Sequence, residues 1–149
     1  MTVIAPAIEN LSLSISEEIR VRSSLAATFS ALLEEMGPSN EGHNGAPLPM
    51  TLEPWPGGRW FRDLGDNSGH LWGHVQAIKR PTLLEITGPL MMSFAVASNL
   101  QYRLKEIEGG TLITLRHTAL GLFPDGYRDA LSQGWPLLFE RVRRRAERA

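Results

Sequence analysis

The sequence predicts an α+β fold in which a curved antiparallel sheet of about six to seven strands wraps around a long C-terminal helix. The chain has 149 residues, which suits one ordinary domain, expected to span residues 1–149. Its central part alternates apolar and polar residues in short runs bounded by turn residues, a pattern typical of antiparallel strands. The last part carries apolar residues at helical spacing, so one helix face matches the apolar face of the sheet.

A first strand and a short helix are predicted before this central part. Residues 11–22 place apolar side chains at odd positions and polar ones at even positions, which indicates a strand with one buried face. Glu17 is the polar exception in the apolar row and marks either a bulge or the mouth of the strand. A short helix is expected over residues 25–36, because Ser24 can cap it and its apolar side chains share one face. Residues 37–49, rich in glycine and proline, form a loop.

Turns rich in glycine and proline divide the central part into short strands. The strands are expected at residues 50–55, 59–64, 70–79, 82–87, 99–107 and 111–118. Residues 91–97 are either a loop or the start of a strand. Leu100, Tyr102 and Leu104 share one parity, so their side chains should face the same side of the sheet.

A long C-terminal helix is indicated by apolar residues spaced four, three, one and three apart. They are Leu131, Trp135, Leu138, Phe139 and Val142. Pro136 lies inside this pattern, lacks a backbone N–H and crowds the preceding turn. The helix is therefore expected to kink at Pro136 or to break into two helices.

Four short motifs follow one another along the chain. Glu53–Trp60 reads E-P-W-P-G-G-R-W, and Gly73–Val75 reads G-H-V. Gly110–His117 reads G-T-L-I-T-L-R-H, and Gly134–Leu138 reads G-W-P-L-L. These segments resemble, in the same order, motifs of the START-like helix-grip (SRPBCC, birch pollen allergen-like) superfamily, and more narrowly of the group named for the activator of heat-shock protein 90 ATPase. The resemblance covers roughly residues 12–145.

The resemblance implies a helix-grip fold with a hydrophobic pocket between the sheet and the C-terminal helix. It does not imply one function, because the superfamily includes lipid carriers, hormone receptors, polyketide cyclases, aromatases and co-chaperones. Three functions remain open. The first is binding of a small hydrophobic or aromatic molecule in the pocket, without chemistry. The second is a cyclase- or aromatase-like enzyme acting in the same pocket, and the third is a protein-interaction module, such as a co-chaperone or a homodimer.

The expected ligand-binding residues are large or polar side chains that can face this pocket. They are Trp60, Trp72, His74, Phe94, Tyr102, His117 and Trp135. Aromatic side chains line adaptable apolar cavities, but they also fill cores. The phenol of Tyr102 needs a hydrogen-bond partner if it is buried, and a ligand could supply one. His74 and His117 lie on different predicted strands. Each either contacts a ligand, as a hydrogen-bond partner or general base, or is packed and hydrogen-bonded in the sheet or exposed at its edge.

Several kinds of chemistry are excluded or disfavoured by the sequence. The chain has no cysteine, so it has no disulfide, thiolate metal site or cysteine nucleophile. His70 and His74 are four residues apart on a predicted strand, about 13 Å, which is too far for one metal ion. Gly57 and Gly58 lead into a strand and not a helix, which indicates a turn rather than a phosphate loop. No catalytic residue, metal or cofactor is therefore assigned.

The net charge of −1 hides an uneven distribution. Residues 141–149 hold five arginines and one glutamate, whereas residues 1–140 carry a net charge of −5. Cations at the end of a helix complement its dipole, and this explanation is preferred to phosphate or nucleic-acid binding. The chain begins without a basic segment and apolar core, and it has no run of about 20 apolar residues. A cytoplasmic protein that does not insert into membranes is therefore expected.

Overall fold

The computed structural model describes residues 1–4, 7–42, 44–90 and 95–149. Within these residues, seven antiparallel strands form one sheet in the order β1-β7-β6-β5-β4-β3-β2. The elements are η1 (Ile8–Leu11), β1 (Ser12–Val21), α1 (Leu25–Met36), β2 (Thr51–Leu52), β3 (Arg59–Gly65), β4 (Ser68–Lys79), β5 (Leu83–Gly88), β6 (Val96–Ile107), β7 (Gly110–Gly121) and α2 (Tyr127–Arg148). The predicted α+β class, the short helix after the first strand and the long C-terminal helix are confirmed.

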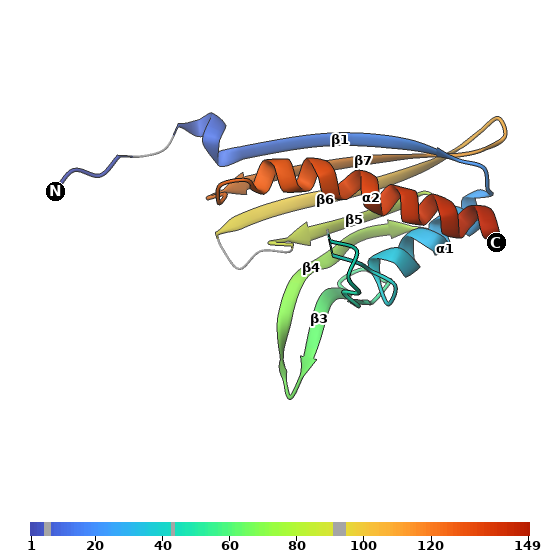
Figure 1. Ribbon diagram of the computed structural model, residues 1–149, viewed down its shortest axis with the longest axis horizontal. Helices are drawn as coiled ribbons and strands as arrows, with labels where there is room; N and C mark the ends of the chain where they lie inside the picture. The colour runs from blue at the N-terminus through green and yellow to red at the C-terminus, as the bar shows by residue number, and fades with distance from the viewer. Residues whose placement is uncertain (5–6, 43, 91–94) are drawn as a thin grey trace.

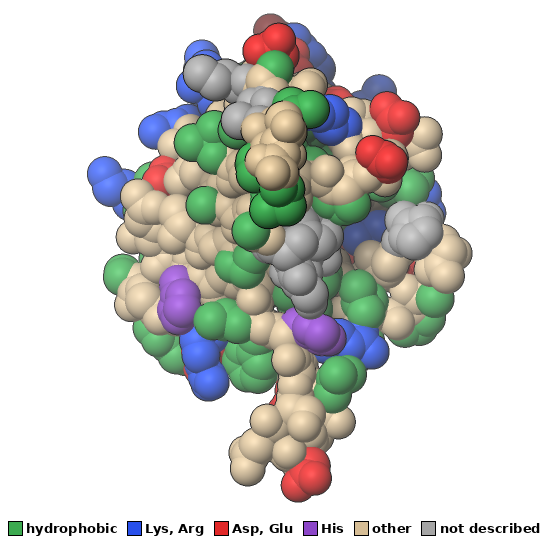
Figure 2. Space-filling model, turned by 90° about the vertical axis from the view of Figure 1, so that its left-hand side faces the viewer, with side chains coloured by type: hydrophobic (Ala, Val, Ile, Leu, Met, Phe, Trp, Pro, Cys, Tyr) green, Lys and Arg blue, Asp and Glu red, His purple; other side chains and the backbone are tan. Residues whose placement is uncertain are grey.

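The long helix α2 lies across one face of the sheet, and α1 packs against its C-terminal half (Figure 1). The core fills the space between the helices and the sheet. It includes Leu100 and Leu115 from the central strands and Leu138 and Val142 from α2, all of them buried. β3 and β4 extend further and project from the body as a hairpin (Figures 1 and 2). The helices therefore leave the projecting part of this hairpin uncovered.

The first strand pairs with β7 without any shift of register. The ladder runs from Ser12 opposite Leu120 to Val21 opposite Thr111. Glu17 is half-buried within this ladder, and the bulge considered there is absent. A regular strand tolerates this carboxylate because β1 is an edge strand, where a long side chain can extend past the sheet to water.

Strand lengths differ from the prediction in two places. β2 is only two residues long, because Pro54 and Pro56 lack the N–H groups that would continue the ladder. β6 and β7 are each 12 residues long, more than expected, since they pair with one another along their whole length. Residues 91–94, part of the segment predicted as either loop or strand, lie outside the described residues.

Both helices begin and continue for identifiable reasons. Ser24 caps α1 by accepting a hydrogen bond from the backbone N–H of Ala27 at 3.1 Å. α2 runs through Pro136 as one helix of 22 residues, so the predicted break into two helices is wrong. Pro136 removes one backbone hydrogen bond, but Trp135 and Leu138 on either side of it are buried in the core. This burial holds both halves of the helix on the sheet.

The Glu53–Trp60 motif builds the turn between β2 and β3. The Glu53 carboxylate accepts hydrogen bonds from the Arg59 guanidinium and from the Arg59 backbone N–H, both at 2.8 Å. The side-chain bond and then the backbone bond lower the pKa of Glu53 to about 2. A side chain at Gly58 would place its Cβ 2.0 Å from the carbonyl oxygen of Glu53. This glycine is required by the close approach of two backbone segments, so this part of the motif has a structural explanation.

Replacing Gly58 by alanine should destabilise the fold strongly, because the new methyl group would overlap the backbone of Glu53. Gly57→Ala is the matched control, since its Cβ would meet no atom within 4 Å and only its φ of 82° opposes the substitution. We expect urea unfolding to show a loss of about 1 kcal/mol for Gly57→Ala and at least ~3 kcal/mol for Gly58→Ala. Equal losses would contradict this explanation of the motif.

Candidate ligand-binding cavity

A cavity of about 370 Å³ lies between α2, the loop after α1 and the β3–β4 pair. Its wall is mostly apolar and contains three tryptophans, several aliphatic side chains and a few polar groups. The wall includes Met36, Asn40, Glu41, Leu48, Trp60, Trp72, Gly134, Trp135, Leu138 and Arg141. An apolar wall with few polar groups is typical of sites for small organic molecules.

Trp60 and Trp72 form one part of the wall as a contacting pair. Their ring centroids are 5.0 Å apart and their planes are nearly perpendicular, at 82°. Trp60 is buried, and its indole N–H donates to the Met36 carbonyl at 2.7 Å, which joins β3 to the end of α1. The register of β4 against β3 shifts between Trp60 and Phe61, so Trp72 is the extra residue of a β-bulge. The bulge turns the Trp72 side chain toward the cavity.

Trp135 joins α2 to the sheet through His117 of β7. The Trp135 indole N–H donates to His117 Nδ1 at 3.2 Å. His117 is fully buried, and this desolvation lowers the pKa of its imidazole to about 4. Because an indole N–H can only donate, Nδ1 must accept, and the neutral ring carries its proton on Nε2. That Nε2 has no hydrogen-bond partner among the described residues.

Tyr102 of β6 lies diagonally next to His117, because Leu100 pairs with His117 and Tyr102 follows two residues later. Its hydroxyl is buried and has no hydrogen-bond partner in the described part of the chain. Burial raises the pKa of Tyr102, and the positive charge of Arg141 partly opposes this rise. Its ring packs edge-on against Phe139 of α2, with centroids 6.3 Å apart. Tyr102 and His117 are thus core residues beneath α2.

The structure places the predicted tryptophans in the cavity wall and the predicted polar residues outside it. Trp60, Trp72 and Trp135 all line the cavity. Tyr102 and His117 are buried behind it and do not belong to its wall. The structure therefore brings the three tryptophans together around one space, and their role in binding stays a prediction.

The other two predicted residues do not contribute to the described site. His74 is exposed, so its prediction as a pocket residue is wrong. The physical reason is the bulge in β4, after which Gly73 and Val75 are the buried residues and His74 faces solvent. Phe94 lies outside the described residues.

A buried ion-pair network beside the cavity was not predicted. The side chain of Glu35 in α1 is 5% exposed and accepts from Arg141 Nε at 3.0 Å and from Arg145 Nε at 2.6 Å. Arg141 also lines the cavity. From the sequence, the arginines of residues 141–149 are expected to complement the helix dipole, whereas two of them join α2 to α1. A usable signal was the position of Glu35 on the apolar face of its helix, where an unpaired carboxylate is rare.

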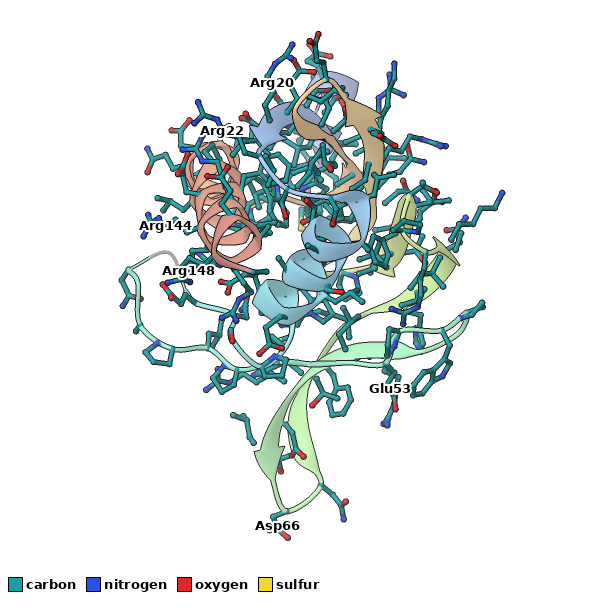
Figure 3. The ribbon with its side chains drawn as sticks, turned by 90° about the vertical axis from the view of Figure 1, so that its right-hand side faces the viewer. Arg20, Arg22, Glu53, Asp66, Arg144 and Arg148 are labelled. Carbon is teal, nitrogen blue, oxygen red and sulfur yellow. The ribbon has the colours of Figure 1, made fainter. Side chains whose placement is uncertain are left out.

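The remaining arginines of this region face away from the cavity. Arg144 and Arg148 of α2 are exposed and lie on the same side of the molecule as Arg20 and Arg22 (Figure 3). The backbone N–H of Arg22 donates to the Glu147 carboxylate at 3.0 Å, which fixes the end of β1 to the end of α2. Arg148 lies in the last turn of α2, where a positive charge complements the helix dipole.

The described residues offer neither a cluster of metal ligands nor a membrane-spanning helix. No group of three or more His, Cys, Asp or Glu side chains among them is placed to hold a metal ion. Of the helices in the same part of the chain, none is long and apolar enough to span a membrane. His70 and His74 are both exposed on β4.

Comparison with solved structures identifies proteins of the same architecture. Scans of protein-family models and of curated proteins gave no match. An uncharacterised protein from Rhizobium leguminosarum is 17% identical, with a TM-score of 0.71 over 93% of this chain and 96% of the other. Ara h 8.0201 is 16% identical, with a TM-score of 0.68 over 93% and 99% of the two chains. The di-domain ARO/CYC StfQ from the steffimycin biosynthetic pathway is 13% identical, with a TM-score of 0.63 over 94% of this chain and 51% of that one.

These structures decide the architecture. The chain has the helix-grip fold. Identities this low show a shared fold and do not transfer a ligand or a reaction. The chain spans about half the length of the di-domain protein. The resemblance to the helix-grip superfamily is confirmed at the level of fold, whereas the narrower resemblance to the group named for the activator of heat-shock protein 90 ATPase stays a prediction.

The buried His117 should make stability depend on pH. Its pKa is about 4 in the folded state and 6.5 in the unfolded state, so the unfolded chain binds an extra proton between these values. The free energy of unfolding should therefore fall as the pH falls through this window, by about 2 kcal/mol between pH 7 and pH 5. Urea unfolding at a series of pH values measures this loss.

Two variants isolate the contribution of His117 to this slope. His117→Gln should flatten the dependence between pH 7 and pH 5, because the titrating group is gone. His74→Gln removes an exposed histidine from β4, which β5 and β6 separate from β7, and should keep the slope. A slope that survives His117→Gln unchanged would contradict the assignment.

Proposed function

We propose that this protein binds a small apolar molecule, mainly aromatic, in the cavity beside α2, without chemical transformation. The observation that carries the proposal is the wall built by Trp60, Trp72 and Trp135 around a space of about 370 Å³. An engineered cavity of ~150 Å³ already holds benzene in another protein. The space in this chain therefore suits a molecule of two or three fused rings.

Two of the three tryptophans are held in place by hydrogen bonds before any ligand binds. Trp60 is fixed by its hydrogen bond to the Met36 carbonyl, and Trp135 by its hydrogen bond to His117. A wall that needs no reordering loses little conformational entropy on binding, which favours affinity. Flat indole rings also offer apolar surface to a flat ligand at the distances that aromatic pairs prefer.

An enzyme of the cyclase or aromatase kind is the alternative with some support. The support is the shared fold with the ARO/CYC protein, together with two buried polar groups, His117 and Tyr102. A general acid or base must come within hydrogen-bond reach of the reacting atom. Because neither residue belongs to the cavity wall, the geometry favours binding over catalysis.

A protein-interaction role, as a co-chaperone-like module or a homodimer, has weaker support. It would call for one large apolar patch on the surface. The large apolar side chains that are exposed belong to separate elements, such as Leu64 and Leu71 on the β3–β4 hairpin and Leu137 on α2. The cavity is the feature that joins apolar residues from several elements.

Filling the cavity from Gly134 should abolish binding without harming the fold. Gly134 lines the cavity, and a Cβ built on it meets no atom within 4 Å. Gly134→Leu should therefore place its side chain in the space that the ligand needs. Two neutral probes, 1-naphthol and 9-fluorenone, should raise the thermal unfolding midpoint of the wild-type protein, and calorimetry should show at least tenfold weaker binding to Gly134→Leu.

Gly134→Ala is the control for this experiment. It should keep most of the binding and gain up to about 1 kcal/mol of stability, because alanine favours the helix over glycine. Unchanged binding of both probes to a folded Gly134→Leu protein would place the site elsewhere and contradict the proposal. No binding of either probe to the wild-type protein would contradict it as well.

A further inference from the structure

We propose that the molecule bound in the cavity carries a carboxylate, and that the guanidinium of Arg141 binds this group. The inference rests on the proposed function, because it names the polar end of the molecule that the three tryptophans hold. It concerns a residue that the sequence patterns did not single out.

The Arg141 side chain is positioned as a prepared donor. It reaches the cavity wall from α2, two turns after Gly134. Its Nε donates to Glu35 Oε1 at 3.0 Å, and the side chain is 15% exposed. This bond uses one edge of the guanidinium, and the terminal nitrogens make no hydrogen bond among the described residues. A guanidinium presents parallel N–H donors that match the two oxygens of a carboxylate.

The charges around Arg141 leave one positive charge without a partner. Glu35 is a single carboxylate, yet it serves both Arg141 and Arg145. The three ionised groups carry a net charge of +1; the side chains of Glu35 and Arg141 are largely buried, whereas that of Arg145 is 38% exposed to water. Arg141 shares its one carboxylate with Arg145, so an anion in the adjoining cavity would give its buried guanidinium a second electrostatic partner.

Arg141 is the one positively charged side chain among the described residues of the wall. Glu41 lines the cavity from the loop after α1, but it forms no ion pair with Arg141 in the described part of the chain. One of the two side-chain N–H groups of Asn40 donates to the Leu48 carbonyl at 3.0 Å, and the amide carries no charge. Arg141 thus supplies the charged donor of the wall from α2, and Trp60 and Trp72 supply its aromatic surface from β3 and β4.

The test compares 1-naphthoic acid with 1-naphthamide, which has the same rings and no charge. Calorimetry at pH 7 should show that the wild-type protein binds the acid at least tenfold more tightly than the amide. Arg141→Gln should remove this preference while leaving the affinity for the amide within about twofold. Arg145→Gln is the matched control: Arg145 shares the ion pair with Glu35 but does not line the cavity, so this variant should keep the preference.

The wild-type comparison needs no variant to fold, so it decides the proposal even if Arg141→Gln proves unstable. Equal affinity of the wild-type protein for acid and amide would overturn the carboxylate proposal and leave the proposed binding function intact.

Tighter binding of 1-naphthylmethylamine than of the acid would also overturn the carboxylate proposal and would point to Glu41. If Arg145→Gln lost the preference for the acid as fully as Arg141→Gln does, the direct contact between Arg141 and the carboxylate would be overturned. Failure of both the acid and the amide to bind would overturn the carboxylate proposal, and failure of the neutral probes as well would contradict the binding function itself.

Discussion

The long helix α2, joined by the short α1 over β6 and β7, has to cover the apolar face of a seven-stranded sheet, and the helices are too narrow to do so. Seven strands at ~4.8 Å spacing are roughly 29 Å wide, whereas a helix with its side chains is about 10–12 Å across. α2 contacts β1 and packs on β7 and β6 through Trp135 and Phe139. Toward the opposite edge of the sheet, β4 and β3 turn away from the helix (Figure 1). The cavity is the space that this mismatch leaves.

The contacts that hold α2 in place also shape the cavity. Trp135 bonds to His117 on one side and lines the cavity on the other. Arg141 does the same, since it pairs with Glu35 of α1 and contributes to the wall. Both contacts bury polar groups, which is unfavourable unless the groups are paired. In both cases the polar groups are paired, and the same residues add polar anchors to the apolar packing of α2.

Most of the fold followed from local patterns. Strands and helices were predicted because a period of two and a period near 3.6 are readable in the sequence. The Glu53–Trp60 segment carried the resemblance to the superfamily, and the structure explains its glutamate and its second glycine as parts of one tight turn. Boundaries were less accurate, because the length of β6 and β7 depends on their mutual pairing. The effect of Pro136 was overestimated, because burial of the same helix face on both sides outweighs one lost hydrogen bond.

The site was predicted only in its aromatic part. Large apolar side chains that fall on the buried face of a strand or helix can be recognised from the sequence, which is why the three tryptophans were candidates. His74 was misplaced because a bulge at Trp72 shifts the parity of β4, and the glycine beside it, Gly73, was the local sign of that bulge. Arg141 was missed because its partner, Glu35, is more than 100 residues away in the chain, and charged residues at a helix end are usually solvated. Contacts between residues far apart in the chain therefore could not be predicted from the sequence.

The four tryptophans allow one direct measurement of the central claim, that the space beside α2 is a binding site. Three of them line the cavity, while Trp55 is 55% exposed and lies outside its wall. Each indole N–H gives its own signal in a ¹H–¹⁵N NMR spectrum, and 1-naphthol can be titrated into the labelled protein. The account predicts that the signals of Trp60, Trp72 and Trp135 shift together while that of Trp55 stays in place. A shift of Trp55 alone, or no shift of the other three at saturation, would contradict it.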